Sequence, residues 1–141
     1  MRKAFPSWGR LFYEGEKMYT VKVEGAFEAA HRVVGYPGKC DRLHGHNWVV
    51  ELSLRGTELD PLGMFLDFKV AKRVLGEILK AYDHRFLNEL APFSNGVNPT
   101  AENLARIIYE AVEEKEELPK GSLAAVTVFE SPKTSVTYTK D

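Results

Sequence analysis

The fold is decided by the segment His44-Gly45-His46-Asn47-Trp48-Val49-Val50-Glu51-Leu52-Ser53-Leu54-Arg55. From residue 47 to residue 55 apolar and polar side chains alternate, which is the period of a strand with one buried face. The apolar face is predicted to carry Trp48, Val50, Leu52 and Leu54. We therefore predict a half-buried strand that needs another layer to pack against.

Segments on either side of this strand predict the rest of the domain. Residues 19–24 alternate in the same way, and the apolar runs 123–130 and 135–140 indicate two more strands. Asp67 suits the cap of a first helix, and Asn98 or Thr100 suits the cap of a second one that begins near Pro99. The order predicts an α+β domain, a four-stranded antiparallel sheet with two helices on one face. The two free edges of such a sheet must be covered, charged or paired, and other subunits are one possible partner.

Length and composition predict one domain. The chain has 141 residues, which we divide into an N-terminal extension (1–18) and a single domain (19–141). The balance of 19 basic and 20 acidic side chains gives no bulk electrostatic reason to expect a nucleic-acid or membrane partner. Cys40 is the one cysteine, so no internal disulfide can form, and no apolar stretch is long enough for a membrane span. We expect a soluble, cytoplasmic protein.

Three of the four histidines are spaced so that they can converge. His44 and His46 flank Gly45 at the start of the predicted strand, and the period of two sends both rings to one face. A hairpin would bring His31 alongside them. Three neutral imidazoles are a catalytic zinc set, with a fourth position for water or substrate. The alternative is that these histidines cap strand ends and bond to the backbone.

Cys40 lies four residues before His44 and admits three interpretations. It is a small buried apolar residue, a fourth zinc ligand that closes a structural site, or a thiol beside an open zinc site that acts as a base. The sequence alone leaves all three open.

Asp83, His84 and Glu130 are further candidates for chemistry. A carboxylate that accepts a hydrogen bond from an imidazole is half of a proton relay, although His84 also suits a helix end favoured by the helix dipole. Glu130 ends an apolar run and is either solvated at the rim or directed at a ligand with two parallel N–H groups. Asp67 and Glu102 are most simply acids at helix N-termini.

Taken together, five segments resemble the 6-pyruvoyltetrahydropterin synthase family, in the right order over residues 19–138. They are Phe27–His31, Cys40–His46, Asp83-His84, Asn98–Asn103 and Phe129-Glu130. The spacing of three residues between Cys40 and His44 is similar to that of the 6-carboxy-5,6,7,8-tetrahydropterin synthases of queuosine biosynthesis. The segment Gly63–Phe68 also resembles that branch. The pyruvoyl synthases, whose animal-type members have a longer insertion between the cysteine and the His-Gly-His segment, are the alternative branch.

The resemblance implies a fold and an assembly. It implies the tunnelling fold (T-fold), in which sheets from three subunits join into a barrel and two trimers stack as a homo-hexamer. It also implies active sites between subunits, so that Asp83 and His84 would serve a zinc held by a neighbouring chain.

The resemblance also implies an activity, that of a zinc-dependent lyase converting 7,8-dihydroneopterin triphosphate to 6-carboxytetrahydropterin, acetaldehyde and triphosphate. Zinc would be held by the three imidazoles, Cys40 would be the base rather than a ligand, and Asp83 and His84 would relay protons. Glu130 would anchor the pterin, assisted by Thr100 and Glu102, although Ala101 stands where some relatives have a second hydroxyl. The triphosphate needs cations, and the candidates near the motifs are Lys39, Arg32, Arg42 and Arg85.

Overall fold

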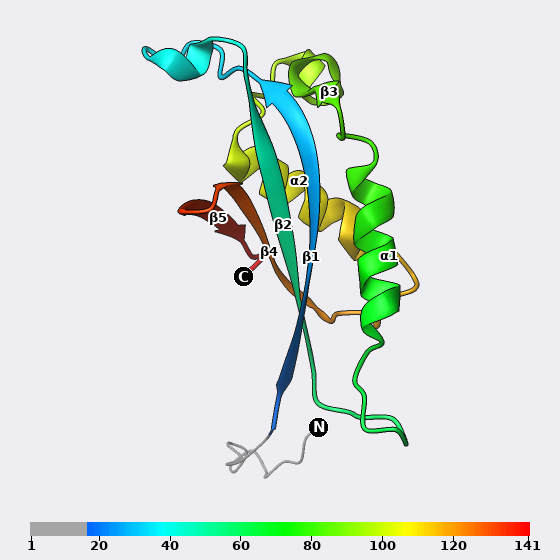
Figure 1. The fold of residues 1–141 in the computed structure, drawn as a ribbon. Coiled ribbons are helices and arrows are strands. Elements are labelled where there is room, and N and C mark those ends of the chain that lie inside the picture. The colour runs from blue at the N-terminus through cyan, green and yellow to red at the C-terminus, as the bar shows by residue number, and fades with distance from the viewer. Residues whose placement is uncertain (1–16) are drawn as a thin grey trace.

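Two long antiparallel strands form the spine of the fold (Figure 1). In the computed structural model, which describes residues 17–141, β1 (Tyr19–His31) and β2 (His44–Gly56) pair along their whole length. β2 also pairs with β4 (Leu123–Ser131), and β4 pairs with β5 (Thr134–Tyr138), all antiparallel. Residues 1–16 of the predicted extension lie outside the described part, so its boundary at residue 18 stays a prediction.

Two α-helices cover one face of this sheet, as predicted (Figure 1). α1 (Phe68–Leu79) begins after Asp67, whose side chain accepts a hydrogen bond from the backbone N–H of Lys69. α2 (Ala101–Glu113) begins after Thr100, whose hydroxyl oxygen accepts from the N–H of Asn103. Thr100 rather than Asn98 is therefore the cap of α2. Within residues 17–141, neither helix has the length and apolarity that crossing a bilayer requires.

The sheet has a fifth strand that the sequence did not predict. The segment β3 (Arg85–Phe86) pairs in parallel with Ala29 and Ala30 of β1, and the strand order is β3-β1-β2-β4-β5. A two-residue strand is too short to show any hydrophobic period, so only its pairing identifies it. The predicted first strand is also longer than the alternation of residues 19–24, because it continues to His31, which pairs with His44.

Short 3-10 turns connect these elements at the end of the sheet where β1 stops. They are η1 (Lys39–Asp41), η2 (Leu87–Glu89) and η3 (Phe93–Asn95). The sheet of the single chain is open, with edges at β3 and β5.

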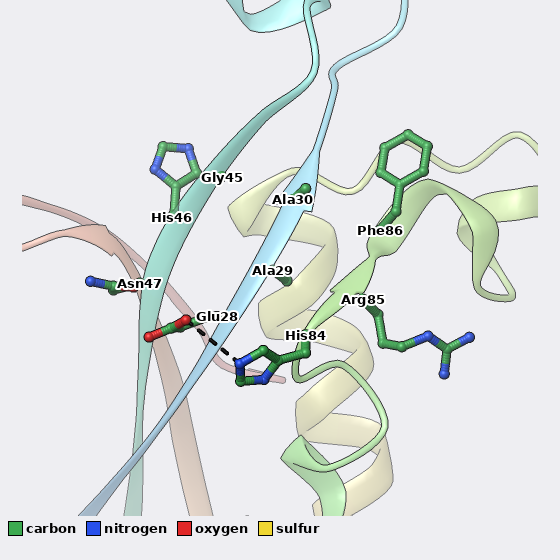
Figure 2. A pocket seen from close by; sticks show the side chains of 9 residues that line it. All are labelled: Glu28, Ala29, Ala30, Gly45, His46, Asn47, His84, Arg85 and Phe86. Carbon is green, nitrogen blue, oxygen red and sulfur yellow. Dashed lines mark ion pairs between the residues drawn. The ribbon is translucent and has the colours of Figure 1, made fainter.

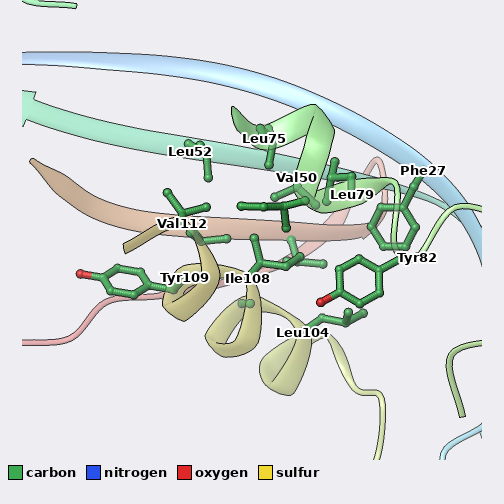
Figure 3. Close-up of a cluster of buried hydrophobic side chains, with 14 of the residues drawn as sticks. Phe27, Val50, Leu52, Leu75, Leu79, Tyr82, Leu104, Ile108, Tyr109 and Val112 are labelled. Atoms are coloured by element: carbon green, nitrogen blue, oxygen red, sulfur yellow. The ribbon is translucent and has the colours of Figure 1, made fainter. Parts of the chain in front are cut away.

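The core lies between the sheet and the two helices (Figure 3). The alternate residues of β2 that form the predicted apolar face are fully buried: Trp48, Val50, Leu52 and Leu54. Leu75 of α1 and Leu104 and Ile108 of α2 belong to the same buried cluster. Each Å² of apolar surface that this face buries contributes about 25 cal/mol to the free energy of unfolding. Burial of this face is therefore a large stabilising contribution to the fold.

Candidate metal centre and active site

His31, His44 and His46 converge at the end of the β1–β2 pair. Strand register places His31 opposite His44 and Ala29 opposite His46, so the three imidazoles share one face. The centroid of the His31 ring lies 4.5 Å from that of His44 and 5.1 Å from that of His46. One ring nitrogen from each residue lies within 4.8 Å of the others, which is the spacing of a possible metal site.

The hydrogen bonds of the rings direct their other nitrogens toward the centre of the cluster. Nδ1 of His31 donates to the carbonyl of Pro99 at 2.7 Å, and Nδ1 of His44 donates to the carbonyl of Arg42 at 2.6 Å, because a carbonyl can only accept. Nε2 of His31 and Nε2 of His46 are buried and have no hydrogen-bond partner. Buried polar atoms are rarely left unpaired, so this donor set fits a divalent metal ion.

The environment favours the neutral form of two of these rings. Burial is the largest effect on both, and it lowers the pKa of His31 and of His46 below the ordinary value of 6.5. The carboxylate of Glu130 opposes this shift, with Oε2 at 3.5 Å from Nε2 of His31 and 3.6 Å from Nε2 of His46. Neutral imidazole is the form that binds metal, so the lowered pKa values favour a metal site.

A pocket of about 330 Å³ lies beside the histidine cluster, and Glu130 links the two. The pocket brings together four of the residues singled out in the sequence: Cys40, Thr100, Glu102 and Glu130. Cys40 is half-buried and, among residues 17–141, the cluster that could hold a metal ion consists of the three histidines. Cys40 therefore shares a pocket with Glu130, whose carboxylate contacts the histidine cluster, and it is not one of the three residues of that cluster.

Asp83 and His84 form a hydrogen-bonded pair in the turn directly before β3. Nδ1 of His84 lies 3.0 Å from Oδ2 of Asp83, and Oδ1 of Asp83 accepts from the backbone N–H of Glu28 at 2.9 Å. The Glu28 N–H, followed by the His84 ring, lowers the pKa of Asp83. The sequence allowed either half of a proton relay or a histidine at a helix end, and the structure shows that the two side chains contact each other.

Within one chain this pair lies away from the Cys40 pocket. His84 lines a second pocket of about 520 Å³ with Glu28 and Arg85, and Nε2 of His84 is 3.8 Å from Oε1 of Glu28 (Figure 2). Glu28 follows Phe27 on β1 and therefore projects from the face opposite to Phe27 and His31. Figure 2 shows the ring of His84 directed at Glu28 and the ring of His46 directed away from it.

Comparison with known proteins identifies the family. The profile of the 6-pyruvoyl tetrahydropterin synthase family matches residues 20–141. The chain belongs to this family. The solved structure of the 6-pyruvoyl tetrahydropterin synthase of Caenorhabditis elegans matches with a TM-score of 0.77 and 31% identity, over 89% of this chain and 97% of that one. The expected T-fold is thereby confirmed for the single subunit, whose antiparallel sheet carries two helices on one face.

Two curated relatives carry the name of the other branch. A putative 6-carboxy-5,6,7,8-tetrahydropterin synthase of Archaeoglobus fulgidus is 34% identical over 100 residues, which are 71% of this chain and 81% of that protein. The 6-carboxy-5,6,7,8-tetrahydropterin synthase of Bacillus subtilis is 33% identical over 106 residues, which are 72% of this chain and 70% of that protein. The protein is therefore an enzyme of the 6-pyruvoyl tetrahydropterin synthase family with relatives in both branches.

Three groups around the site were not predicted from the sequence. The carbonyl of Pro99 orients His31, the backbone of Glu28 binds both Asp83 and His84, and the side chain of Arg32 binds Asp41. Each contact joins segments that are distant in sequence or uses backbone atoms, so no residue pattern signals it. Trp48 was predicted only as a core residue, yet its ring also packs edge-on against His31, at 4.9 Å between centroids.

Proposed function

We propose that this protein converts 7,8-dihydroneopterin triphosphate and water to 6-carboxy-5,6,7,8-tetrahydropterin, acetaldehyde and triphosphate, as a cytoplasmic zinc-dependent lyase of queuosine biosynthesis. The observation that carries the proposal is the pocket that holds Cys40, Thr100, Glu102 and Glu130 together. Its Glu130 reaches within 3.6 Å of two imidazole nitrogens that have no other partner. A base, a carboxylate anchor and a metal-binding cluster are thus adjacent in one chain.

His31, His44 and His46 would hold the zinc ion. When bound, zinc supplies a Lewis acid for the oxygens of the substrate side chain. The chain's own contribution is to fix the ligands in advance, because the carbonyls of Pro99 and Arg42 hold two of the rings through Nδ1.

Glu130 would anchor the pterin by accepting two parallel N–H groups, those of its amino substituent and ring. Thr100 and Glu102 line the same pocket and would assist. The Thr100 oxygen already accepts the N–H of Asn103, so its own proton remains available for donation to a ligand.

Cys40 would remove the proton from a side-chain carbon of the substrate, and Asp83 and His84 would return protons. Because Nδ1 of His84 is bound to Asp83, its Nε2 is the atom that would exchange a proton with the substrate. In one chain His84 lies on the Glu28 side of the sheet, so we propose that it completes the site of a neighbouring copy in a homo-hexamer.

Product analysis tests the reaction. Purified, zinc-loaded protein is incubated with 7,8-dihydroneopterin triphosphate, and the products are identified by mass. We expect 6-carboxytetrahydropterin together with acetaldehyde. Loss of triphosphate without acetaldehyde would assign the alternative 6-pyruvoyltetrahydropterin synthase reaction, which the Caenorhabditis elegans likeness favours. Pterin binding without any product would reject both enzymes in favour of a binding module.

The variant Cys40→Ala tests the role of the thiol. It should retain the fold and bound zinc while turnover falls by about 10² to 10⁴-fold, the usual contribution of a positioned base. Loss of zinc together with the thiol would instead show that Cys40 is a ligand of a closed structural site. The variant Thr134→Ala, which alters another residue of the same pocket, controls for general disturbance of its lining.

A further inference from the structure

The loop that carries Cys40 is attached to the metal-binding end of the sheet at three consecutive residues. The carbonyl of Cys40 accepts the backbone N–H of Val33 at 2.7 Å. The carbonyl of Arg42 accepts Nδ1 of His44 at 2.6 Å. Asp41 lies between these two residues. Its partner is the charged side chain of Arg32, the residue that directly follows β1.

Arg32 makes a two-point contact with Asp41. Its Nε donates to the backbone carbonyl of Asp41 at 2.8 Å, and its Nη2 donates to Oδ1 of the same residue at 2.7 Å. The planar guanidinium group holds both bonds in fixed directions, so it restrains the backbone as well as the side chain of Asp41.

Arg32 and Asp41 are each the sequence neighbour of a residue of the candidate site. Arg32 directly follows His31, which belongs to the metal-binding cluster, and Asp41 directly follows Cys40. The backbone of Arg32 is itself fixed, because its N–H donates to the side chain of Asn88 at 2.9 Å and its carbonyl accepts from the same amide at 3.0 Å. Asp41 is therefore bound to a residue whose own backbone is held by two hydrogen bonds directly after the end of β1.

We propose that Arg32 is a positioning residue, whose two hydrogen bonds to Asp41 hold the Cys40 thiol in place beside the histidine cluster. The inference rests on the proposed function of Cys40. The guanidinium of Arg32 already has a carboxylate partner. Lys39, Arg42 and Arg85 are therefore better candidates than Arg32 for binding the triphosphate. Small displacements of a reacting group lower turnover strongly, so such a restraint matters for catalysis.

Alkylation of the thiol tests the restraint independently of turnover. Cys40 is the one cysteine of the chain, so the rate of its modification by iodoacetamide in zinc-loaded protein reports on this loop. Arg32→Ala and Asp41→Ala should each raise that rate about two- to fivefold, as expected for loss of a partly exposed ion pair with hydrogen bonds. Arg73→Ala, which removes an exposed arginine of α1, should leave it unchanged.

Steady-state kinetics then distinguishes positioning from triphosphate binding. We expect Arg32→Ala and Asp41→Ala to lower kcat about tenfold or more with little change in KM. Arg32→Lys should resemble Arg32→Ala, because lysine keeps the charge but not the two-point contact. It also serves as the milder substitution if Arg32→Ala does not fold.

Three outcomes would overturn the inference. The first is an alkylation rate that is unchanged or slower in both Arg32→Ala and Asp41→Ala. The second is a raised KM in Arg32→Ala while the KM of Asp41→Ala stays at the wild-type value. The third is full activity of Arg32→Lys. Failure of the proposed function gives a different result, in which the wild type forms no product while the alkylation rates still rise in the two variants.

Discussion

Oε2 of Glu130 lies 3.5 Å from Nε2 of His31, on the face of the sheet that the helices cover. This contact joins the pocket that contains Cys40 to the histidine cluster, so a ligand held by Glu130 would lie next to a metal ion held by His31. The two residues come from β4 and β1, which are not neighbours in the sheet, because β2 lies between them.

His31→Ala should abolish zinc binding, because the cluster loses the ligand whose ring is completely buried. A bound metal stabilises the folded state by about 2.7 kcal/mol when its free concentration is 100 times Kd. Zinc should therefore raise the Tm of the wild type but not that of His31→Ala, as measured by thermal unfolding with and without chelator. His84→Ala removes the one histidine outside the cluster and should still bind zinc.

Glu130→Gln should retain zinc but lose affinity for the pterin. The substitution keeps the size of the side chain and replaces a charged acceptor by a neutral amide, which costs about 1.5–3 kcal/mol for a charge-assisted contact. We expect KM for the substrate to rise about tenfold to 100-fold, and isothermal titration with a pterin should show the same loss. Glu110→Gln alters an exposed carboxylate of α2 outside both pockets and should leave KM unchanged.

A changed zinc content in Glu130→Gln together with an unchanged KM would contradict this division of roles. It would make Glu130 a metal ligand rather than the anchor of the pterin.

Metal-free protein should lose stability as the pH falls below about 6.5. Burial lowers the pKa of His31 and His46 in the folded state, so between their folded values and 6.5 the unfolded chain binds protons that the folded chain does not. The free energy of unfolding is then highest above the unfolded pKa and declines through this window. Urea unfolding of chelator-treated protein at about pH 7.5 and about pH 5.5 measures the decline.

The double variant His31→Ala/His46→Ala should show a flatter dependence over the same range, because it lacks both groups. An equally steep decline in this variant would assign the effect to other titrating groups.

Trp48→Phe should destabilise the fold and weaken the metal site. The indole is fully buried, stacks on Phe27 with centroids 5.9 Å apart, and donates from Nε1 to the carbonyl of Ala29 at 3.2 Å. Its replacement leaves a small cavity and removes that donor, at a cost of about 1–3 kcal/mol in the free energy of unfolding. Leu62→Ala changes a side chain that is 81% exposed and should cost less than about 0.5 kcal/mol.

Zinc affinity provides a second measurement on Trp48→Phe, because the indole packs against His31 and His46. Unchanged affinity would show that packing against the indole is not needed to hold the rings of His31 and His46 in place.

Residue patterns alone predicted four of the five strands, both α-helices and the face on which His44 and His46 lie. The alternation from Trp48 to Leu54 defined the buried face of β2, and the same period placed His44 and His46 on that face. The helix caps Asp67 and Thr100 were among those predicted, since caps depend on residues only two or three positions apart. Such features are local, and a single segment contains all the information that they need.

How these parts meet depends on the packing of the whole chain. Three contacts depend on the path of the loops between elements. They are the pairing of β3 with β1, the hydrogen bond from His31 to the carbonyl of Pro99, and the hydrogen bond from Arg32 to Asp41. The same is true of the separation of His84 from the Cys40 pocket, because the pairing of β3 with β1 is what places His84 beside Glu28. Residue patterns specify which face of an element is buried, but the relative placement of side chains on different elements results from packing of the whole chain.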